Sequence, residues 1–294
     1  MKYAYYPGCV AKSSAPELYE STAQIADKLG IELAELTAAS CCGAGVVNEG
    51  DPFLNVLLNA RTFAMAENLG LNILTICSTC QGVMQQAKWQ LDNNSCLRAE
   101  TNEALAQINV QYDGKVKVKH LLWMLIEDYG LPKLEQHVVR PLEGLKIAPF
   151  YGCYLLRPAE ALQFENHEKP TSLEQLITSL GGETVHYEGE TKCCGFPILF
   201  VQRQTAFQMA AAYLSHAEQK GADLMVTPCP LCHISLDTYQ GKAAKQAKAH
   251  INVPVMHLSQ MIGLALGVEP EKLGFSKHIV STAKALSRWS QHRL

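Results

Sequence analysis

Residues 40–43 (Ser-Cys-Cys-Gly) and 192–195 (Lys-Cys-Cys-Gly) decide how this 294-residue chain is built. Each is followed, after 33 further residues, by a C-x2-C pair. One more cysteine precedes each Cys-Cys pair, by 31 intervening residues in the first case and 39 in the second. The two sets are Cys9, Cys41, Cys42, Cys77 and Cys80, and Cys153, Cys193, Cys194, Cys229 and Cys232. Five cysteines repeated in one order, with an identical distance from the Cys-Cys pair to the C-x2-C pair, indicate an internal duplication.

Other residues repeat in step with the cysteines. Residues 2–9 (KYAYYPGC) align with residues 146–153 (KIAPFYGC), and residues 118–124 (VKHLLWM) align with residues 255–261 (VMHLSQM). A proline and a glycine bracket a short polar link at residues 141–144, which is typical of a boundary. The predicted organisation is a first cysteine-rich domain at 1–143, a second at 144–271, and a tail at 272–294.

Strand and helix patterns alternate in both halves. The first half has strand patterns at 3–6, 31–36 and 72–76 and helix patterns at 16–29 and 53–69. The second half has helix patterns at 172–180 and 199–220 and a strand pattern at 223–227. This alternation predicts an α/β fold: two tandem, duplicated halves with mostly parallel sheets, related by an approximate twofold axis.

Composition excludes several classes of protein. Hydrophobic residues make up 48% and charged residues 18%, which fits a folded chain and argues against disorder or a coiled coil. A net charge of −3 offers no basic field for nucleic acid. No apolar run reaches the roughly 18 residues needed to cross a bilayer, and the N-terminal segment has no apolar signal-peptide core. We therefore expect a cytoplasmic protein, where cysteines stay reduced.

The cysteines of each half follow predicted strands. Ligands of open α/β sheets bind beyond the carboxyl ends of the strands, so each half should deliver five thiols to one rim. A structural zinc ion takes four ligands and leaves a fifth thiolate unused. Adjacent cysteines in extended chain point in opposite directions and cannot easily bind one ion together. An iron–sulfur cluster offers several iron atoms for thiolates to bind, and sets of soft thiolate ligands favour such clusters. We therefore expect one cluster in each half.

Other interpretations of these residues remain open. One alternative is five disulfides among the ten cysteines, which a reducing compartment opposes. Another is zinc in one half, with the first half as the preferred candidate. Cys96 has no counterpart in the second half and is interpreted as an ordinary thiol. His120 and His257 recur at equivalent strand-to-helix junctions, where they cap or pack, or else contact a cluster. Lys192 either lies on the surface or adjusts a cluster's potential by its charge.

The doubled motif resembles the CCG-domain family, whose best-known member is the B-type subunit of heterodisulfide reductase. The resemblance runs from Lys2 to about Phe275, and residues 227–233 (TPCPLCH) look like the family's second C-x2-C segment. In that family each five-cysteine motif holds a noncubane [4Fe–4S] cluster, and a disulfide between the two facing clusters is cleaved by one electron from each. The resemblance implies that the two sets named above are the ligands of two such clusters.

The same pair of domains occurs in other complexes. It resembles the anchor subunit of atypical succinate dehydrogenases, which is thought to react with quinone, and subunits of lactate- and glycolate-oxidising complexes. The resemblance implies a flavoprotein and ferredoxin-like iron–sulfur subunits as partners. The chain has no G-x-G-x-x-G fingerprint for a dinucleotide of its own, which agrees with electrons arriving from another subunit.

The tail at 272–294 is basic and contains no acidic residue. Its apolar residues recur at helical spacing, and its basic residues include Lys284, Arg288 and Arg293. Such a helix either lies peripherally in a membrane interface, at the cytoplasmic face, or docks on its own domain or a partner.

Three functions follow. The first is an iron–sulfur oxidoreductase subunit of heterodisulfide reductase B type, reducing a disulfide and active only within a complex. The second is a quinone-reactive, membrane-attaching electron-transfer subunit of a succinate dehydrogenase or fumarate reductase-like complex. The third is a non-redox zinc scaffold. The unused fifth thiol of each set argues against the scaffold.

Overall fold

The computed structural model describes residues 1–291 and contains two four-stranded sheets, in each of which every strand pair is parallel. The strands are β1 (Lys2–Tyr6), β2 (Glu32–Glu35), β3 (Ile73–Thr75) and β4 (Val118–His120), then β5 (Lys146–Pro149), β6 (Glu183–Thr184), β7 (Leu224–Thr227) and β8 (Val255–His257). The orders are β2-β1-β3-β4 and β6-β5-β7-β8. The identical order of the two sheets confirms the predicted duplicated α/β fold.

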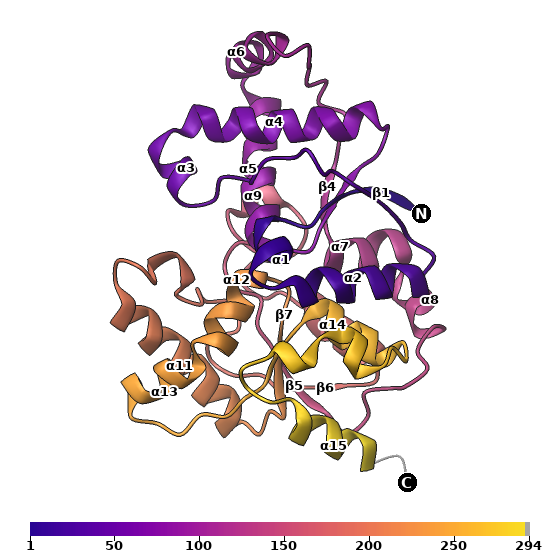
Figure 1. Ribbon diagram of the computed structural model, residues 1–294, viewed down its shortest axis with the longest axis vertical. Coiled ribbons are helices and arrows are strands. Elements are labelled where there is room, and N and C mark those ends of the chain that lie inside the picture. Colours follow the sequence, from indigo (N-terminus) through magenta and orange to yellow (C-terminus); the bar gives the residue numbers. More distant parts are fainter. Residues whose placement is uncertain (292–294) are drawn as a thin grey trace.

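Helices connect the strands and cover the sheets (Figure 1). Those of the first half are α1 (Cys9–Ser13), α2 (Pro16–Lys28), α3 (Val46–Gly50), α4 (Pro52–Asn68), α5 (Ser78–Asn93), α6 (Ser95–Ala106), α7 (Leu121–Met124), the π-helix η1 (Leu125–Tyr129) and α8 (Leu131–Glu135). Those that follow are α9 (Ala159–Leu162), α10 (Ser172–Ser179), η2 (Phe196–Ile198), α11 (Arg203–Gln219), α12 (Pro230–His233), η3 (Ile234–Thr238), α13 (Gln240–Ala247), α14 (Leu258–Ala265), η4 (Pro270–Leu273), η5 (Phe275–Lys277) and α15 (Ala283–Gln291). The expected boundary at 143/144 falls between α8 and β5 and stays a prediction.

Local sequence explains where the main helices begin and end. Helix α2 starts with Pro16 in its first turn and stops before Gly30, whose φ of +64° favours glycine. The Asp51 side chain accepts a hydrogen bond of 2.9 Å from the Leu54 N–H and so caps α4. The predicted helices at 16–29 and 53–69 therefore match α2 and α4.

One predicted helix begins later than expected. The pattern at 199–220 corresponds to α11, which starts at Arg203, and the residues just before it form turns after the short 3₁₀ helix η2. Phe200 and Val201 are each 76% exposed in these turns. Their apolar side chains continue the helix pattern in the sequence, but both are mostly exposed, and the Phe200 ring contacts the Phe196 ring of η2 edge-on.

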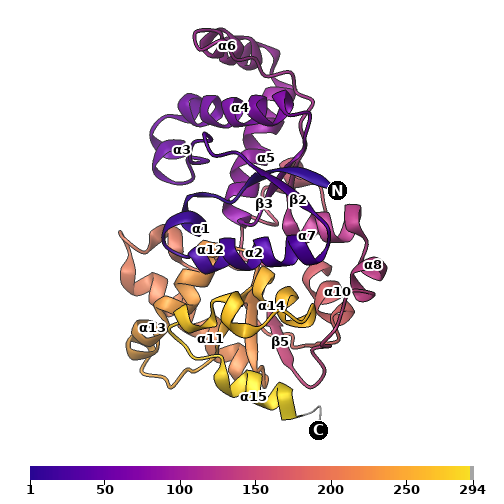
Figure 2. The same cartoon turned by 45° about the vertical axis from the view of Figure 1, so that its right-hand side comes forward.

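The two halves share one interface. Helix α2 of the first half lies against α14 of the second in both views (Figures 1 and 2). The Ser21 and Ser259 hydroxyls hydrogen bond across this contact at 2.7 Å, and both residues are buried. Elsewhere, a side chain at Gly82 of α5 would come within 2.7 Å of the Tyr154 backbone oxygen, so glycine allows the halves to approach closely. Two clusters of buried apolar residues each include side chains from both halves.

The C-terminal helix α15 packs on the protein. Trp289 is 6% exposed, and its indole N–H donates a hydrogen bond of 2.8 Å to the Pro141 carbonyl. Arg288 pairs with Asp223 at 2.8 Å. The buried face of α15 thus packs on this same chain, at Pro141 and Asp223, and membrane contact of the tail stays a prediction. Arg293 lies outside the described residues. Among residues 1–291, no helix combines the length and apolar character needed to cross a bilayer.

Candidate metal centre

The cysteines lie at the carboxyl ends of the central strands. Cys9 opens α1 just after β1, and Cys77 lies between β3 and α5 as the residue that caps α5. Cys80 follows in the first turn of α5. The second half repeats the arrangement, with Cys229 between β7 and α12 and Cys232 within α12. The parallel sheets therefore deliver these thiols to one end, as the sequence predicted.

In the first set the thiols approach one another in pairs. The sulfurs of Cys9 and Cys41 are 3.7 Å apart. Those of Cys42 and Cys80 are 3.5 Å apart. All five cysteines are free of disulfides.

The second set pairs in the same way. Cys153 hydrogen bonds with Cys193, and Cys194 hydrogen bonds with Cys232. These are the residues equivalent to the two pairs of the first set, and they too are free thiols. The structure thus brings together, in corresponding pairs, the residues that the sequence grouped.

The two sets meet at the interface between the halves. The thiol of Cys77 hydrogen bonds with Cys229 of the other set, which raises the pKa of Cys77. The hydroxyl of Thr79 lies 3.4 Å from the Cys229 sulfur. Both cysteines are buried. The two cysteine sets therefore meet at Cys77 and Cys229.

Within each set the pKa values of the thiols shift in opposite directions. Hydrogen bonds from Cys42 and Cys9 lower the pKa of Cys41 to about 2, and those from Cys153 and Cys194 lower the pKa of Cys193 to about 3. The hydrogen bond to Cys41 raises the pKa of Cys9 in turn. Crowded thiols cannot all lose their protons unless a cation balances the charge, and thiolates are the form that binds soft metals.

Glycines make room for the sulfurs. Gly8 has φ +82° and ψ 160°, and a Cβ there would lie 3.0 Å from the Cys80 sulfur. Gly152 has φ +72°, and a Cβ there would lie 3.1 Å from the Cys232 sulfur. The same close approach in both halves leaves space that a side chain would fill.

Buried polar groups orient the Cys-Cys segments. The amides of Asn55 and Asn59 donate to the Cys42 carbonyl at 2.8 and 3.0 Å. In the second half the hydroxyl of Ser235 donates to the Cys194 carbonyl at 2.8 Å. The sequence analysis missed these residues. A signal was present for the asparagines, because two amides four residues apart interrupt the apolar face of a helix.

The structure also places the other candidate residues. His120 and His257 each occupy the cap position of the next helix, α7 and α14, and burial lowers the pKa of each to about 4. Cys96 is exposed in α6, and the Lys192 side chain is exposed.

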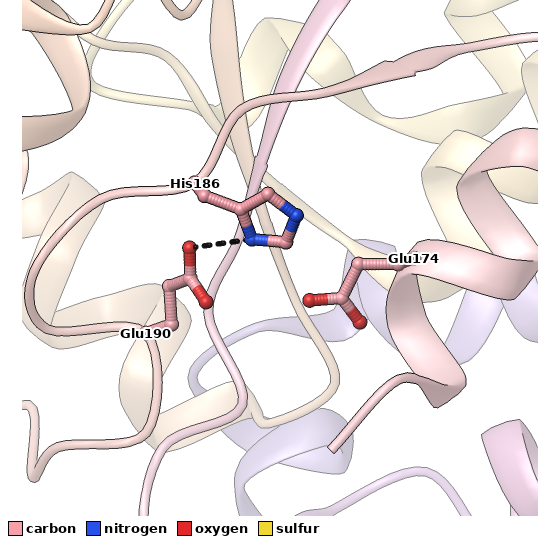
Figure 3. A group of neighbouring side chains, drawn as sticks. All are labelled: Glu174, His186 and Glu190. Atoms are coloured by element: carbon pink, nitrogen blue, oxygen red, sulfur yellow. Dashed lines mark hydrogen bonds and ion pairs between the residues drawn. The ribbon is translucent and has the colours of Figure 1, made fainter. Parts of the chain in front are cut away.

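A separate group of possible metal ligands comprises Glu174, His186 and Glu190 (Figure 3). The His186 imidazole lies between the two carboxylates and contacts Glu190 at 3.2 Å. Glu190 also accepts from the Tyr187 N–H, and Glu174 accepts from the Tyr151 hydroxyl. These hydrogen bonds give the cluster a structural role: they hold in place the segment that precedes the Cys-Cys pair of the second set.

Two cavities adjoin the cysteines. One of about 220 Å³ borders the first set, and one of about 500 Å³ borders Cys153, Cys194, Cys229 and Cys232. Both share Thr79 and Leu231 as a wall. The larger one opens past Val46, Phe200 and Val201, which are 76–87% exposed. Among the described residues that line either cavity there is no lysine, arginine or histidine.

The chain is similar to known proteins over nearly its whole length. The CCG cysteine-rich domain matches residues 3–85 and again residues 147–237. The 8-methylmenaquinol:fumarate reductase membrane anchor subunit of Wolinella succinogenes is 40% identical, over 96% of this chain and 98% of that one. The B-type subunit of the ferredoxin/F420H2-dependent CoB-CoM heterodisulfide reductase of Methanosarcina acetivorans is 30% identical, over 98% and 96%.

A solved structure supports the fold alone. The crystal structure of a hypothetical protein from Helicobacter pylori superposes with a TM-score of 0.76 at 16% identity and covers 95% of this chain. This chain spans about half (52%) of that longer one.

Proposed function

Because the chain belongs to the CCG cysteine-rich domain family, we propose that it is an iron–sulfur oxidoreductase subunit of the heterodisulfide reductase B type. Each five-cysteine set would hold one [4Fe–4S] cluster, of the noncubane kind that the family resemblance implies, and would supply one-electron transfer. The observation that carries the proposal is the contact between the two sets, at Cys77 and Cys229, beside a shared pair of cavities.

The spacing of the thiols supports a polynuclear group over zinc. Four thiolates around one zinc ion lie about 3.8 Å from one another, given Zn–S bonds of about 2.3 Å. Here the sulfurs of the first set form a chain of contacts, Cys9 to Cys41 at 3.7 Å and Cys42 to Cys80 at 3.5 Å, with Cys41 and Cys42 interacting between them. Among the described residues, the three-ligand groups whose atoms all lie within 4.8 Å of one another include no cysteine. Five thiols spread in this way suit a cluster with several metal atoms better than a single ion.

A disulfide is the first substrate class. Its reduction consumes two electrons and two protons, breaks one S–S bond and yields two thiols. The two cavities, one beside each cysteine set and with Thr79 and Leu231 as a common wall, would let one electron come from each side. Relatives named as heterodisulfide reductase subunits support this assignment.

A quinone is the second candidate, and the cavities favour it. Reduction of a quinone likewise takes two electrons and two protons, and the product is a quinol. An apolar mouth without a cationic side chain suits a neutral ring better than an anionic disulfide. The relative from Wolinella succinogenes, whose name includes a menaquinol, supports the same substrate class.

Both candidates imply a larger assembly. The chain would act with a flavoprotein and ferredoxin-like iron–sulfur subunits, in the cytoplasm or at the cytoplasmic face of a membrane. Relatives named as subunits of reductase complexes support partner subunits in general.

The first test is the metal content of anaerobically purified protein. We expect about eight iron and eight acid-labile sulfide per chain, with no zinc, and an EPR signal from the same sample. About four iron and one zinc would restrict the redox role to one half. Zinc alone would overturn the proposal and leave a structural scaffold.

Single substitutions then assign the ligands. Cys42→Ser is expected to halve the iron content by emptying the first set, and Cys194→Ser to do the same for the second. Cys96→Ser is the matched control and should retain all of the iron, since Cys96 is exposed and belongs to neither set. Full iron and full activity in both ligand variants would show that the assignment is wrong.

A further inference from the structure

Two buried histidines reach across the interface in opposite directions. His120 closes β4 in the first half, and its Nε2 lies 2.9 Å from the carbonyl oxygen of Pro228 in the second. His257 closes β8 in the second half, and its Nε2 lies 3.0 Å from the carbonyl oxygen of Ile76 in the first. Both imidazoles are 0% exposed. The two contacts are equivalent, because each joins a histidine of one half to a backbone carbonyl of the other half.

The hydrogen bonds fix the tautomer of both rings. The Leu122 N–H donates to Nδ1 of His120 at 3.1 Å, and the Ser259 N–H donates to Nδ1 of His257 at 3.3 Å. An Nδ1 that accepts carries no proton, so in the neutral ring Nε2 carries it. Each Nε2–H therefore donates to the carbonyl of the opposite half.

Those two carbonyls are placed at the cysteine sets. Ile76 immediately precedes Cys77, and Pro228 immediately precedes Cys229. Each imidazole thus holds the peptide unit that joins the end of a strand to a cysteine of the other half. Cys77 and Cys229 are also the two cysteines that contact each other between the sets.

We propose that His120 and His257 are positioning residues that act crosswise: each caps a helix in its own half and holds in place the cysteine loop of the other half. The proposal rests on the proposed function for its iron readout, but the crossed geometry concerns this chain's own residues. Neither histidine is assigned as a metal ligand.

The two crossed hydrogen bonds differ in how much their carbonyl groups depend on them. The Pro228 carbonyl also accepts from the Ser78 hydroxyl at 3.2 Å, so it keeps one partner if His120 is lost. Among the described residues the Ile76 carbonyl has no hydroxyl partner of this kind: it accepts from the imidazole of His257 at 3.0 Å, and its contact with the His120 ring is a smaller one. Leaving a buried carbonyl unpaired costs about 1–3 kcal/mol. Loss of His257 should therefore loosen the first set more than loss of His120 loosens the second.

Amide isosteres separate the two roles of each ring. Asparagine places its carbonyl oxygen near the position of Nδ1, so His257→Asn retains the helix cap and removes the crossed bond. Glutamine places its NH₂ near the position of Nε2, so His257→Gln retains the crossed donor and removes the cap. His120→Asn and His120→Gln form the matched pair in the first half.

The measurement is anaerobic alkylation of the iron-loaded full chain, followed cysteine by cysteine by mass spectrometry. We expect His257→Asn to speed modification of Cys77 and the rest of the first set at least tenfold and to leave the second set near its wild-type rate. His120→Asn should speed the second set, by less. The glutamine variants should stay near wild type. Exposed Cys96 serves as the internal standard for reagent and time.

A second readout follows the potential of a single cluster. In the Cys194→Ser background, which retains the first set, His257→Asn should shift the EPR-monitored reduction equilibrium about tenfold, or about 59 mV for one electron. His120→Asn should shift it much less.

Each outcome decides the matter. Faster alkylation in the histidine's own half, or equally in both halves, would overturn the crossed role and leave simple capping or general loosening. A wild-type chain without iron would refute the proposed function instead, and the crossed pattern could still be measured on its free thiols.

Discussion

At the scale of single residues, space beside the sulfurs is set by glycine. Gly8 has φ +82° and ψ 160°, a combination that is open almost only to glycine, and it faces the Cys80 sulfur. The sequence shows a Gly-Cys pair in both halves, at residues 8–9 and 152–153, but not that the glycine approaches a cysteine about 70 or 80 residues further on. That approach depends on how β1 and β3, or β5 and β7, lie side by side.

Gly8→Ala is expected to destabilise the chain by about 1–3 kcal/mol and to reduce iron in the first half, because its Cβ meets the Cys80 sulfur at 3.0 Å. Gly30→Ala is the control: its φ is +64°, yet a Cβ there has nothing within 4 Å. It should lose some stability from backbone strain and no iron. Iron analysis and urea unfolding measure both effects, and a Gly8→Ala variant with a full complement of iron would contradict the argument.

At the scale of elements, periodicity predicted most helices and strands but not where each helix docks. An amphipathic helix has the same pattern whether its apolar face meets a bilayer or its own domain, so the tail at 272–294 was ambiguous. The pattern at 199–220 was extended too far because Phe200 and Val201 continue the apolar spacing while lying in turns. Both shortcomings of the sequence-based prediction have one cause, because tertiary contacts decide which surface an apolar side chain packs against.

Trp289→Ala should lower the free energy of unfolding by about 3–5 kcal/mol, as expected for a buried aromatic side chain. Lys284→Ala in the same helix is the control and should change it by less than about 0.5 kcal/mol, because that side chain is exposed. Urea unfolding of the two variants checks this. If Trp289→Ala leaves stability unchanged but abolishes binding to anionic lipid vesicles, the helix is a membrane contact after all.

At the scale of the whole molecule, the duplication and the grouping of the ten cysteines could be predicted because spacing in the chain records them. The meeting of the halves could not. The contacts of His120 with Pro228 and of His257 with Ile76 join residues more than 100 positions apart that share no local pattern. They arise from how two similar surfaces pack on each other. The composition of the cavity mouth, which bears on the substrate, is set by the same packing.

The mouth of the larger cavity allows the two substrate classes to be told apart by the sign of an effect. Val201 is 76% exposed at this mouth, and Val139 is 67% exposed but lines neither cavity. Val201→Lys removes apolar surface and adds a positive charge where the lining has none. For a short-chain naphthoquinone we expect KM to rise roughly five- to tenfold, which corresponds to about 1–1.4 kcal/mol.

For oxidised glutathione, an anionic disulfide, the same substitution should lower KM several-fold, because a cation at the mouth attracts it. Val139→Lys should leave KM for both substrates unchanged, and iron content should be equal in all variants. The assay uses the complex with its partner subunits and an artificial electron donor. A rise for the quinone with turnover retained supports the apolar substrate that the cavity favours; turnover of the disulfide alone, with a lowered KM, assigns the site to a disulfide. If neither KM changes, the substrate enters by another route and the cavity is not its site.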